Sequence, residues 1–164
     1  MHALKYGGLP RIADDMAAAM GGLSDRTIGS SALVPIPLAP KRLRQRGYNQ
    51  SDALARALGR QWKVPVLPHL LTRTRETPTQ TALTPETRLA NVAGAFAVAH
   101  KPRPGVLTPG WQPGVNQPWP VLVLVDDVFT TGATLAEAAR ALEQAGATHV
   151  YGVTFARAAI PDFT

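Results

Sequence analysis

The stretch Val121–Thr134, VLVLVDDVFTTGAT, constrains the fold of this chain more than any other segment. Its first five residues, Val121–Val125, are all valine or leucine and predict a strand that is buried on both faces, as in a parallel sheet covered by helices. Two adjacent aspartates follow this run, and then comes a turn with three threonines and a glycine. With the alanine-rich segment behind it, the stretch predicts a strand, a turn and a helix of an α/β protein.

The rest of the chain alternates segments typical of strands with segments typical of helices, which indicates a single α/β domain over residues 1–164 with a mainly parallel sheet. Pro and Gly dominate residues 100–120, which we interpret as a surface insertion. Beside Val121–Val125, the expected strands are Ser31–Leu38, Val64–Thr74 and His149–Ala156. The expected helices are Leu9–Met20, a helix capped by Ser51 that ends near Gly59, and Thr134–Ala147 with Gly146 as its C-cap.

Composition limits the classes of partner. The 164 residues carry a formal charge of +6, which favours an anionic partner, either a phosphorylated metabolite or a nucleic acid. No apolar run approaches the roughly 18 to 20 residues of a membrane span, and the first residues do not resemble a signal peptide, so we expect a cytoplasmic protein. The chain has no cysteine and four scattered histidines, so any metal ion must be held by oxygen.

The threonine turn is suited to a phosphate group. A helix that begins near Gly132 or Ala133 offers unpaired backbone N–H groups and the positive end of its dipole. The hydroxyls of Thr130, Thr131 and Thr134 can add hydrogen-bond donors, and Gly132 allows a close approach of the backbone. A P-loop and a dinucleotide fingerprint are excluded, because neither GxxxxGK[ST] nor GxGxxG occurs in the chain.

The aspartate pair calls for a different ligand group. Asp126 and Asp127 would repel phosphate oxygens, but carboxylates accept hydrogen bonds from vicinal hydroxyls and bind hard cations such as Mg²⁺. A sugar phosphate with a 2,3-diol would satisfy both halves of the segment. The alternative is that an aspartate here only caps the following helix.

The whole segment resembles the phosphoribosyl pyrophosphate (PRPP) signature of the type I phosphoribosyltransferases. Two other stretches, VPIPLAPKRLRQRGYNQSDALARAL and LTRTRETPTQTALTPETRLANVAGAF, resemble the ComF/GntX family within that group. The resemblance implies the type I phosphoribosyltransferase fold, a mainly parallel open sheet flanked by helices with a small hood, here residues 73–91. It implies that Asp126 and Asp127 face the ribose hydroxyls and that Mg²⁺ is the cofactor. The residues it assigns to the 5-phosphate are Thr130, Thr131, Gly132, Ala133 and Thr134, and those it assigns to catalysis are Asp126, Asp127, Arg73 and Arg88.

The basic segment KRLRQRGYNQ follows an expected strand end, where it can face the pyrophosphate of PRPP. Guanidinium groups bind such oxygens with two hydrogen bonds, although a solvated basic surface is the alternative. The residues predicted for the pyrophosphate are Lys41, Arg42, Arg44 and Arg46.

The resemblance implies a PRPP-binding protein that transfers or binds a phosphoribosyl group and is associated with competence and DNA uptake. The alternatives are a non-catalytic module for PRPP or single-stranded DNA and, with less support, a nucleobase salvage enzyme. The ComF/GntX family commonly begins with a cysteine-rich zinc module. This chain has no cysteine and therefore resembles the transferase domain without that module.

Overall fold

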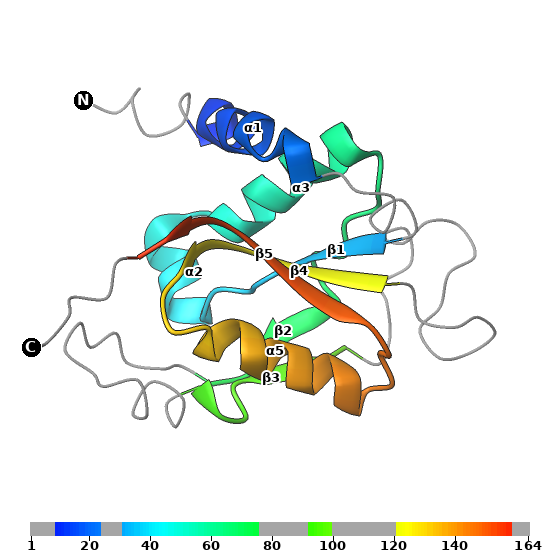
Figure 1. Ribbon diagram of the computed structural model, residues 1–164. Coiled ribbons are helices and arrows are strands. Elements are labelled where there is room, and N and C mark those ends of the chain that lie inside the picture. The colour runs from blue at the N-terminus through cyan, green and yellow to red at the C-terminus, as the bar shows by residue number, and fades with distance from the viewer. Residues whose placement is uncertain (1–8, 24–30, 76–91, 100–120, 159–164) are drawn as a thin grey trace, which may run out of the picture.

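The computed structural model describes residues 9–23, 31–75, 92–99 and 121–158 (Figure 1). Three strands form a parallel sheet in the order β1-β4-β5, with β1 at Ser31–Pro35, β4 at Val121–Phe129 and β5 at Val150–Arg157. A second sheet pairs β2, Leu71–Arg73, antiparallel to β3, Phe96–Val98. The prediction of an α/β fold with a mainly parallel, helix-flanked sheet is confirmed, and the arrangement is consistent with a type I phosphoribosyltransferase-like fold.

Helices cover both faces of the parallel sheet. The helices α1, Leu9–Ala19, and α3, Gln50–Trp62, lie on one face, and α5, Ala133–Gln144, lies on the other (Figure 1). A short helix α2, Pro40–Arg46, lies beyond the carboxyl end of β1, and a 3₁₀ turn η2, Gly21–Leu23, follows α1. Within the described residues, no helix is long and apolar enough to cross a membrane.

The two faces of the sheet have separate cores because side chains alternate along each strand. Leu33 and Val123 pack with α1 and α3, whereas Val34 and Leu124 pack with α5. The side chains of these four residues are at most 5% exposed. Burying a leucine or valine stabilises the fold by about 1.5 to 3 kcal/mol, so the valine and leucine run of β4 holds both layers together.

The structure corrects the expected strand Val64–Thr74. Only Val66 joins the parallel sheet, through an isolated bridge to Leu33, and the later residues Leu71–Arg73 form β2 in the second sheet. Pro65 and Pro68 have no N–H group to donate, so a continuous ladder cannot run through this segment. Strand β3 was not predicted.

Two helices also differ from prediction. The basic segment after β1 forms helix α2, which was not among the expected helices, with a proline at its start and Gly47 in the left-handed conformation at its end. Helix α3 continues through the buried Gly59 to Trp62. The predicted surface insertion, residues 100–120, lies outside the described residues.

Candidate functional site

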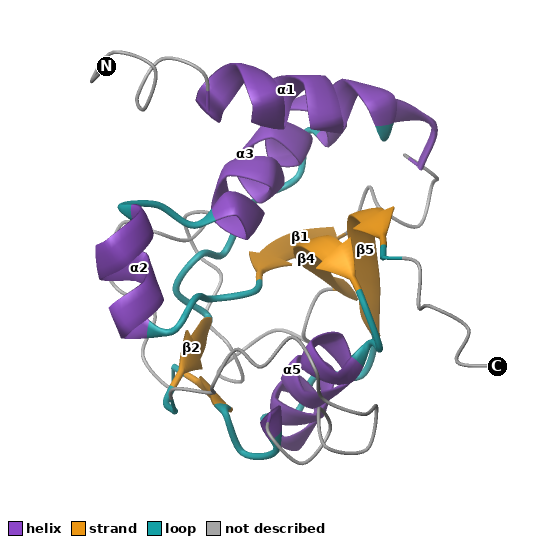
Figure 2. Cartoon of the chain, turned by 90° about the vertical axis from the view of Figure 1, so that its left-hand side faces the viewer, coloured by secondary structure: helices purple, strands orange, loops and turns teal. Residues whose placement is uncertain are grey.

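The candidate site lies at the carboxyl ends of the parallel strands. Helix α2 and the first turns of α3 and α5 lie at this edge of the sheet, on the left of Figure 1, and Figure 2 views the molecule from that side. Ligands in open α/β sheets bind beyond this edge, at the connections between the ends of strands and the starts of helices. The sheet topology therefore brings the aspartate pair, the threonine turn and the basic segment to one end of the molecule.

Asp126 lies just beyond the end of β1, at a point where β4 keeps only β5 as a neighbour. The last residue of β1, Pro35, pairs with Val125, whereas Asp126 pairs with Thr154 of β5. The aspartates were predicted to follow the strand, but β4 runs through both of them to Phe129. Its pairing with β5 extends the strand, and this pairing has no signal in the β4 sequence itself.

The start of helix α3 occupies the place that β1 leaves open. Ser51 Oγ donates a hydrogen bond of 2.9 Å to Asp126 Oδ1. Asn49 caps α3 by accepting a hydrogen bond from the Ser51 N–H, and its amide group donates to the carbonyl of Ile36 at 2.9 Å. Asn49, rather than the predicted Ser51, is therefore the N-cap, and the buried Ser51 is instead a contact of the candidate site.

The two aspartates differ in environment. The pKa of Asp126 is raised to about 6. Burial is the main cause, the Ser51 hydrogen bond acts in the opposite direction, and the neighbouring charge of Asp127 adds to the effect of burial. Asp126 Oδ1 also accepts a hydrogen bond from the Asp127 N–H, and Asp127 Oδ1 accepts one from the Val128 N–H. One oxygen of each carboxylate is thus used within the protein, and the other can accept a hydroxyl or bind a cation.

The turn from β4 to α5 is shaped around a glycine in the left-handed conformation. Helix α5 begins at Ala133, as predicted, and Gly132 before it has a φ of 79°. A Cβ atom at Gly132 would lie 3.0 Å from two ring carbons of Phe129, so both the backbone conformation and the packing require glycine here. Thr130 is exposed and Thr131 and Thr134 are half-buried, which leaves their hydroxyls within reach of a ligand at the start of α5.

The described side chains at this end of the protein would need ligand oxygens to complete a magnesium site. Among the residues that the structure describes, no group of three or more His, Cys, Asp or Glu side chains is placed to hold a metal ion. Mg²⁺ is commonly bound by one or two carboxylates together with substrate phosphates. The second oxygens of Asp126 and Asp127 fit such a shared site.

The predicted pyrophosphate residues all lie on helix α2. Residues four apart share a face of a helix, so Arg42 and Arg46 lie on one side of α2, whereas Lys41 and Arg44 lie on another. Arg46 donates a hydrogen bond of 2.7 Å to Gln50, the first residue of α3. Arg46, which shares a face of α2 with Arg42, is therefore in contact with the start of α3.

Of the two other predicted arginines, the structure describes only Arg73, which lies in the second sheet. Arg73 is the last residue of β2, and its guanidinium carbon lies 5.3 Å from the centre of the Phe96 ring. Arg88, and most of the predicted hood over residues 73–91, lie outside the described residues. The structure thus places the aspartates, Ser51 and the threonine turn at one edge of the sheet.

The chain is similar to several proteins named for competence or DNA utilization. It is 34% identical over 127 residues to Competence protein F of Haemophilus influenzae. This alignment covers 77% of this chain and 50% of that protein. It is 37% identical over 122 residues to the DNA utilization protein YhgH of Escherichia coli K12, covering 72% of this chain and 45% of the relative. Competence protein ComFC of Streptococcus pneumoniae is 32% identical to the chain over 117 residues, an alignment that covers 71% of this chain and 44% of that protein.

The chain belongs to a ComF-like family. This confirms the resemblance that the basic and polar sequence stretches indicated. No family model matches the chain. The chain spans about half the length of the curated relatives it matches.

Proposed function

We propose that this ComF-like chain binds PRPP together with Mg²⁺ and acts as a phosphoribosyltransferase-like protein. The observation that carries the proposal is the joining of Asp126 and Asp127 to the glycine-containing threonine turn at the start of α5. Carboxylates suit a ribose diol, and a helix N-terminus with hydroxyls suits the 5-phosphate. The relatives' names support a role of the protein in competence and DNA uptake.

In a transfer reaction, an acceptor would displace pyrophosphate from C1 of the ribose. Asp126 and Asp127 would orient the ribose through its hydroxyls, and the N–H groups of Ala133 and Thr134 would hold the 5-phosphate. The Ala133 N–H donates a long hydrogen bond of 3.5 Å to Thr131 Oγ1, which the phosphate would replace. Arg42 and Arg46 would neutralise charge on the departing pyrophosphate. Mg²⁺, when bound, would supply a further positive charge to the pyrophosphate oxygens.

A second candidate function is the binding of single-stranded DNA. It is favoured by the names of the relatives, by the formal charge of +6 and by the exposed cations Lys41, Arg44 and Arg46 of α2. A pyrophosphate site and a DNA backbone site require the same kind of basic surface. The two functions can therefore use the same helix.

Titration calorimetry with PRPP, in Mg²⁺ and in chelator, tests the first proposal. We expect Mg²⁺-dependent binding that weakens roughly tenfold to a hundredfold in Asp126→Asn and in Asp127→Asn, since each loses a charged hydrogen bond of about 1.5 to 3 kcal/mol. Asp15→Asn, on the exposed side of α1, is the control and should bind as the unaltered protein does. Unchanged affinity in both site variants would remove the ribose assignment.

A further inference from the structure

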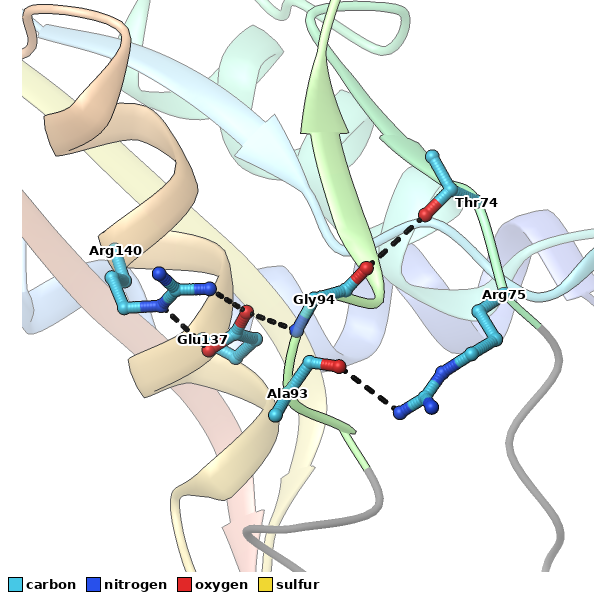
Figure 3. Close-up of polar contacts among 6 residues, drawn as sticks. All are labelled: Thr74, Arg75, Ala93, Gly94, Glu137 and Arg140. Atoms are coloured by element: carbon cyan, nitrogen blue, oxygen red, sulfur yellow. Dashed lines mark hydrogen bonds and ion pairs between the residues drawn. The ribbon is translucent and has the colours of Figure 1, made fainter.

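Glu137 of helix α5 has an environment unlike that of an ordinary surface glutamate. Its side chain is only 11% exposed. Arg140 holds both carboxylate oxygens, with Nε 2.9 Å from Oε2 and Nη2 2.5 Å from Oε1. The backbone N–H of Gly94 donates a third hydrogen bond, of 2.7 Å, to Oε1 (Figure 3). The Arg140 hydrogen bonds lower the pKa of Glu137, and the Gly94 N–H acts in the same direction.

Gly94 belongs to a short bridge between the two chain segments that flank residues 76–91. Thr74 Oγ1 donates to the Gly94 carbonyl at 3.3 Å, and the Thr74 N–H donates to the Ala95 carbonyl at 2.9 Å. Arg75 donates to the Ala93 carbonyl at 3.0 Å (Figure 3). These contacts extend the pairing of β2 with β3 by two residues. The strand pair, here called the hairpin, is therefore joined to Gly94 and its neighbours by hydrogen bonds.

The backbone at Gly94 is shaped to present its N–H to Glu137. Its φ is 67°, a conformation that residues with a side chain rarely adopt, although the space around it would admit a Cβ atom. Glycine is therefore required by the backbone conformation and not by crowding. The turn places the N–H group toward α5, where the carboxylate accepts it.

The position of Glu137 on α5 relates this contact to the candidate phosphate site. Glu137 lies three residues after Thr134, so the two residues are neighbours on one face of the helix. The hairpin and the parallel sheet form two separate sheets with no shared ladder. Apolar packing of Phe96 and Leu71 holds the hairpin against the core, but such packing is non-directional, whereas a hydrogen bond to a carboxylate fixes orientation.

We propose that Glu137 is a positioning residue that fixes the β2–β3 hairpin, and with it Arg73, relative to the ligand-binding turn at the start of α5. Arg140 holds the Glu137 carboxylate in the orientation that receives the Gly94 N–H. Glu137 itself touches no ligand. The consequence for ligand binding rests on the proposed function, because it assumes that PRPP contacts both the threonine turn and the hairpin arginine.

Hydrogen exchange of the Gly94 amide, followed by NMR without any ligand, tests the contact itself. We expect faster exchange in Glu137→Ala, little change in Glu137→Gln, whose side-chain oxygen still accepts the hydrogen bond, and an intermediate rate in Arg140→Ala. Arg60→Ala removes the exposed ion pair with Asp14 on the other face of the sheet and is the matched control. Unchanged Gly94 exchange in Glu137→Ala would overturn the contact as the determinant of hairpin position.

A comparison of two ligands tests the consequence for binding. We expect Glu137→Ala to weaken PRPP about tenfold, and ribose 5-phosphate by less than about twofold, because the latter needs only the aspartates and the turn. Glu137→Gln should restore most of the PRPP affinity. Equal loss of both ligands would show a general defect of folding and overturn the inference.

The two measurements separate this inference from the proposed function. If the unaltered protein binds neither PRPP nor ribose 5-phosphate, the proposed function is wrong and the ligand consequence falls with it. The exchange rate of Gly94 in the variants still decides whether Glu137 positions the hairpin.

Discussion

At the scale of single residues, Asp126 costs stability in the folded protein. Its pKa rises from 3.8 to about 6, chiefly because burial disfavours the charged carboxylate. Between these two values the folded protein holds a proton that the unfolded chain has released, so stability falls as pH rises through this window. Above about pH 6 the charged Asp126 lowers the free energy of unfolding by its full amount, at most about 3 kcal/mol. A buried carboxylate kept at such a cost is typical of a functional site.

Replacement of Asp126 by Asn should therefore stabilise the protein in a pH-dependent manner. We expect Asp126→Asn to raise the free energy of unfolding by about 1 to 3 kcal/mol at pH 8 and to give little gain near pH 4. The asparagine oxygen can still accept the hydrogen bonds from Ser51 and the Asp127 N–H. Urea unfolding in chelator across this range is the measurement. A gain that does not change with pH would contradict the assigned effect of burial.

At the scale of elements, the Val121–Thr134 stretch was the most predictable part of the fold. The helices α1, α3 and α5 have a clear apolar face, and their existence follows from that periodicity. Helix α2 was missed because none of its residues is buried, so its sequence carries no apolar period. The extension of β4 to Phe129 depends on pairing with β5, and the Ser51 to Asp126 contact joins residues 75 positions apart. Local sequence patterns do not encode either feature.

Gly47 and Gly132, each at the end of a helix, allow the effect of backbone strain to be compared with the effect of side-chain crowding. Gly132 and Gly47 have φ values of 79° and 77°, but only Gly132 lies close to a ring, that of Phe129. We expect Gly47→Ala to lower the free energy of unfolding by about 1 to 2 kcal/mol from strain alone. Gly132→Ala should lower it by more and should also weaken PRPP binding, because the turn must shift.

Thermal unfolding and calorimetry of both variants check this expectation. A Gly132→Ala protein that matches Gly47→Ala in stability and retains full PRPP affinity would show that the turn tolerates a side chain. The start of α5 would then not be a tightly shaped phosphate site.

At the scale of the whole molecule, the excess of positive charge has two proposed partners at one edge of the sheet. The helix α2 carries four of the seventeen Lys and Arg residues of the chain. If the cations of α2 bind pyrophosphate, only one face of the helix can contact this small ligand, because the cations on the other face point away from it. The Arg42 and Arg46 face is adjacent to the start of α3, so it is the better candidate.

The final prediction compares the two faces of α2 with two ligands. We expect joint replacement of Arg42 and Arg46 by Ala to weaken PRPP at least about tenfold more than joint replacement of Lys41 and Arg44. For a single-stranded oligonucleotide, both double variants should reduce the salt dependence of binding, because phosphate contacts release counterions whatever their orientation.

Competition decides whether the two ligands share this edge of the molecule. PRPP with Mg²⁺ should displace a fluorescent oligonucleotide from the unaltered protein, because pyrophosphate and a nucleic-acid backbone need the same guanidinium groups. The oligonucleotide should resist displacement by ribose 5-phosphate, which lacks the pyrophosphate and occupies only the threonine turn. An oligonucleotide that stays bound at saturating PRPP would place DNA on another surface. The α2 arginines would then serve the metabolite alone, and the proposed role in DNA uptake would have to rest on residues away from the carboxyl edge of the sheet.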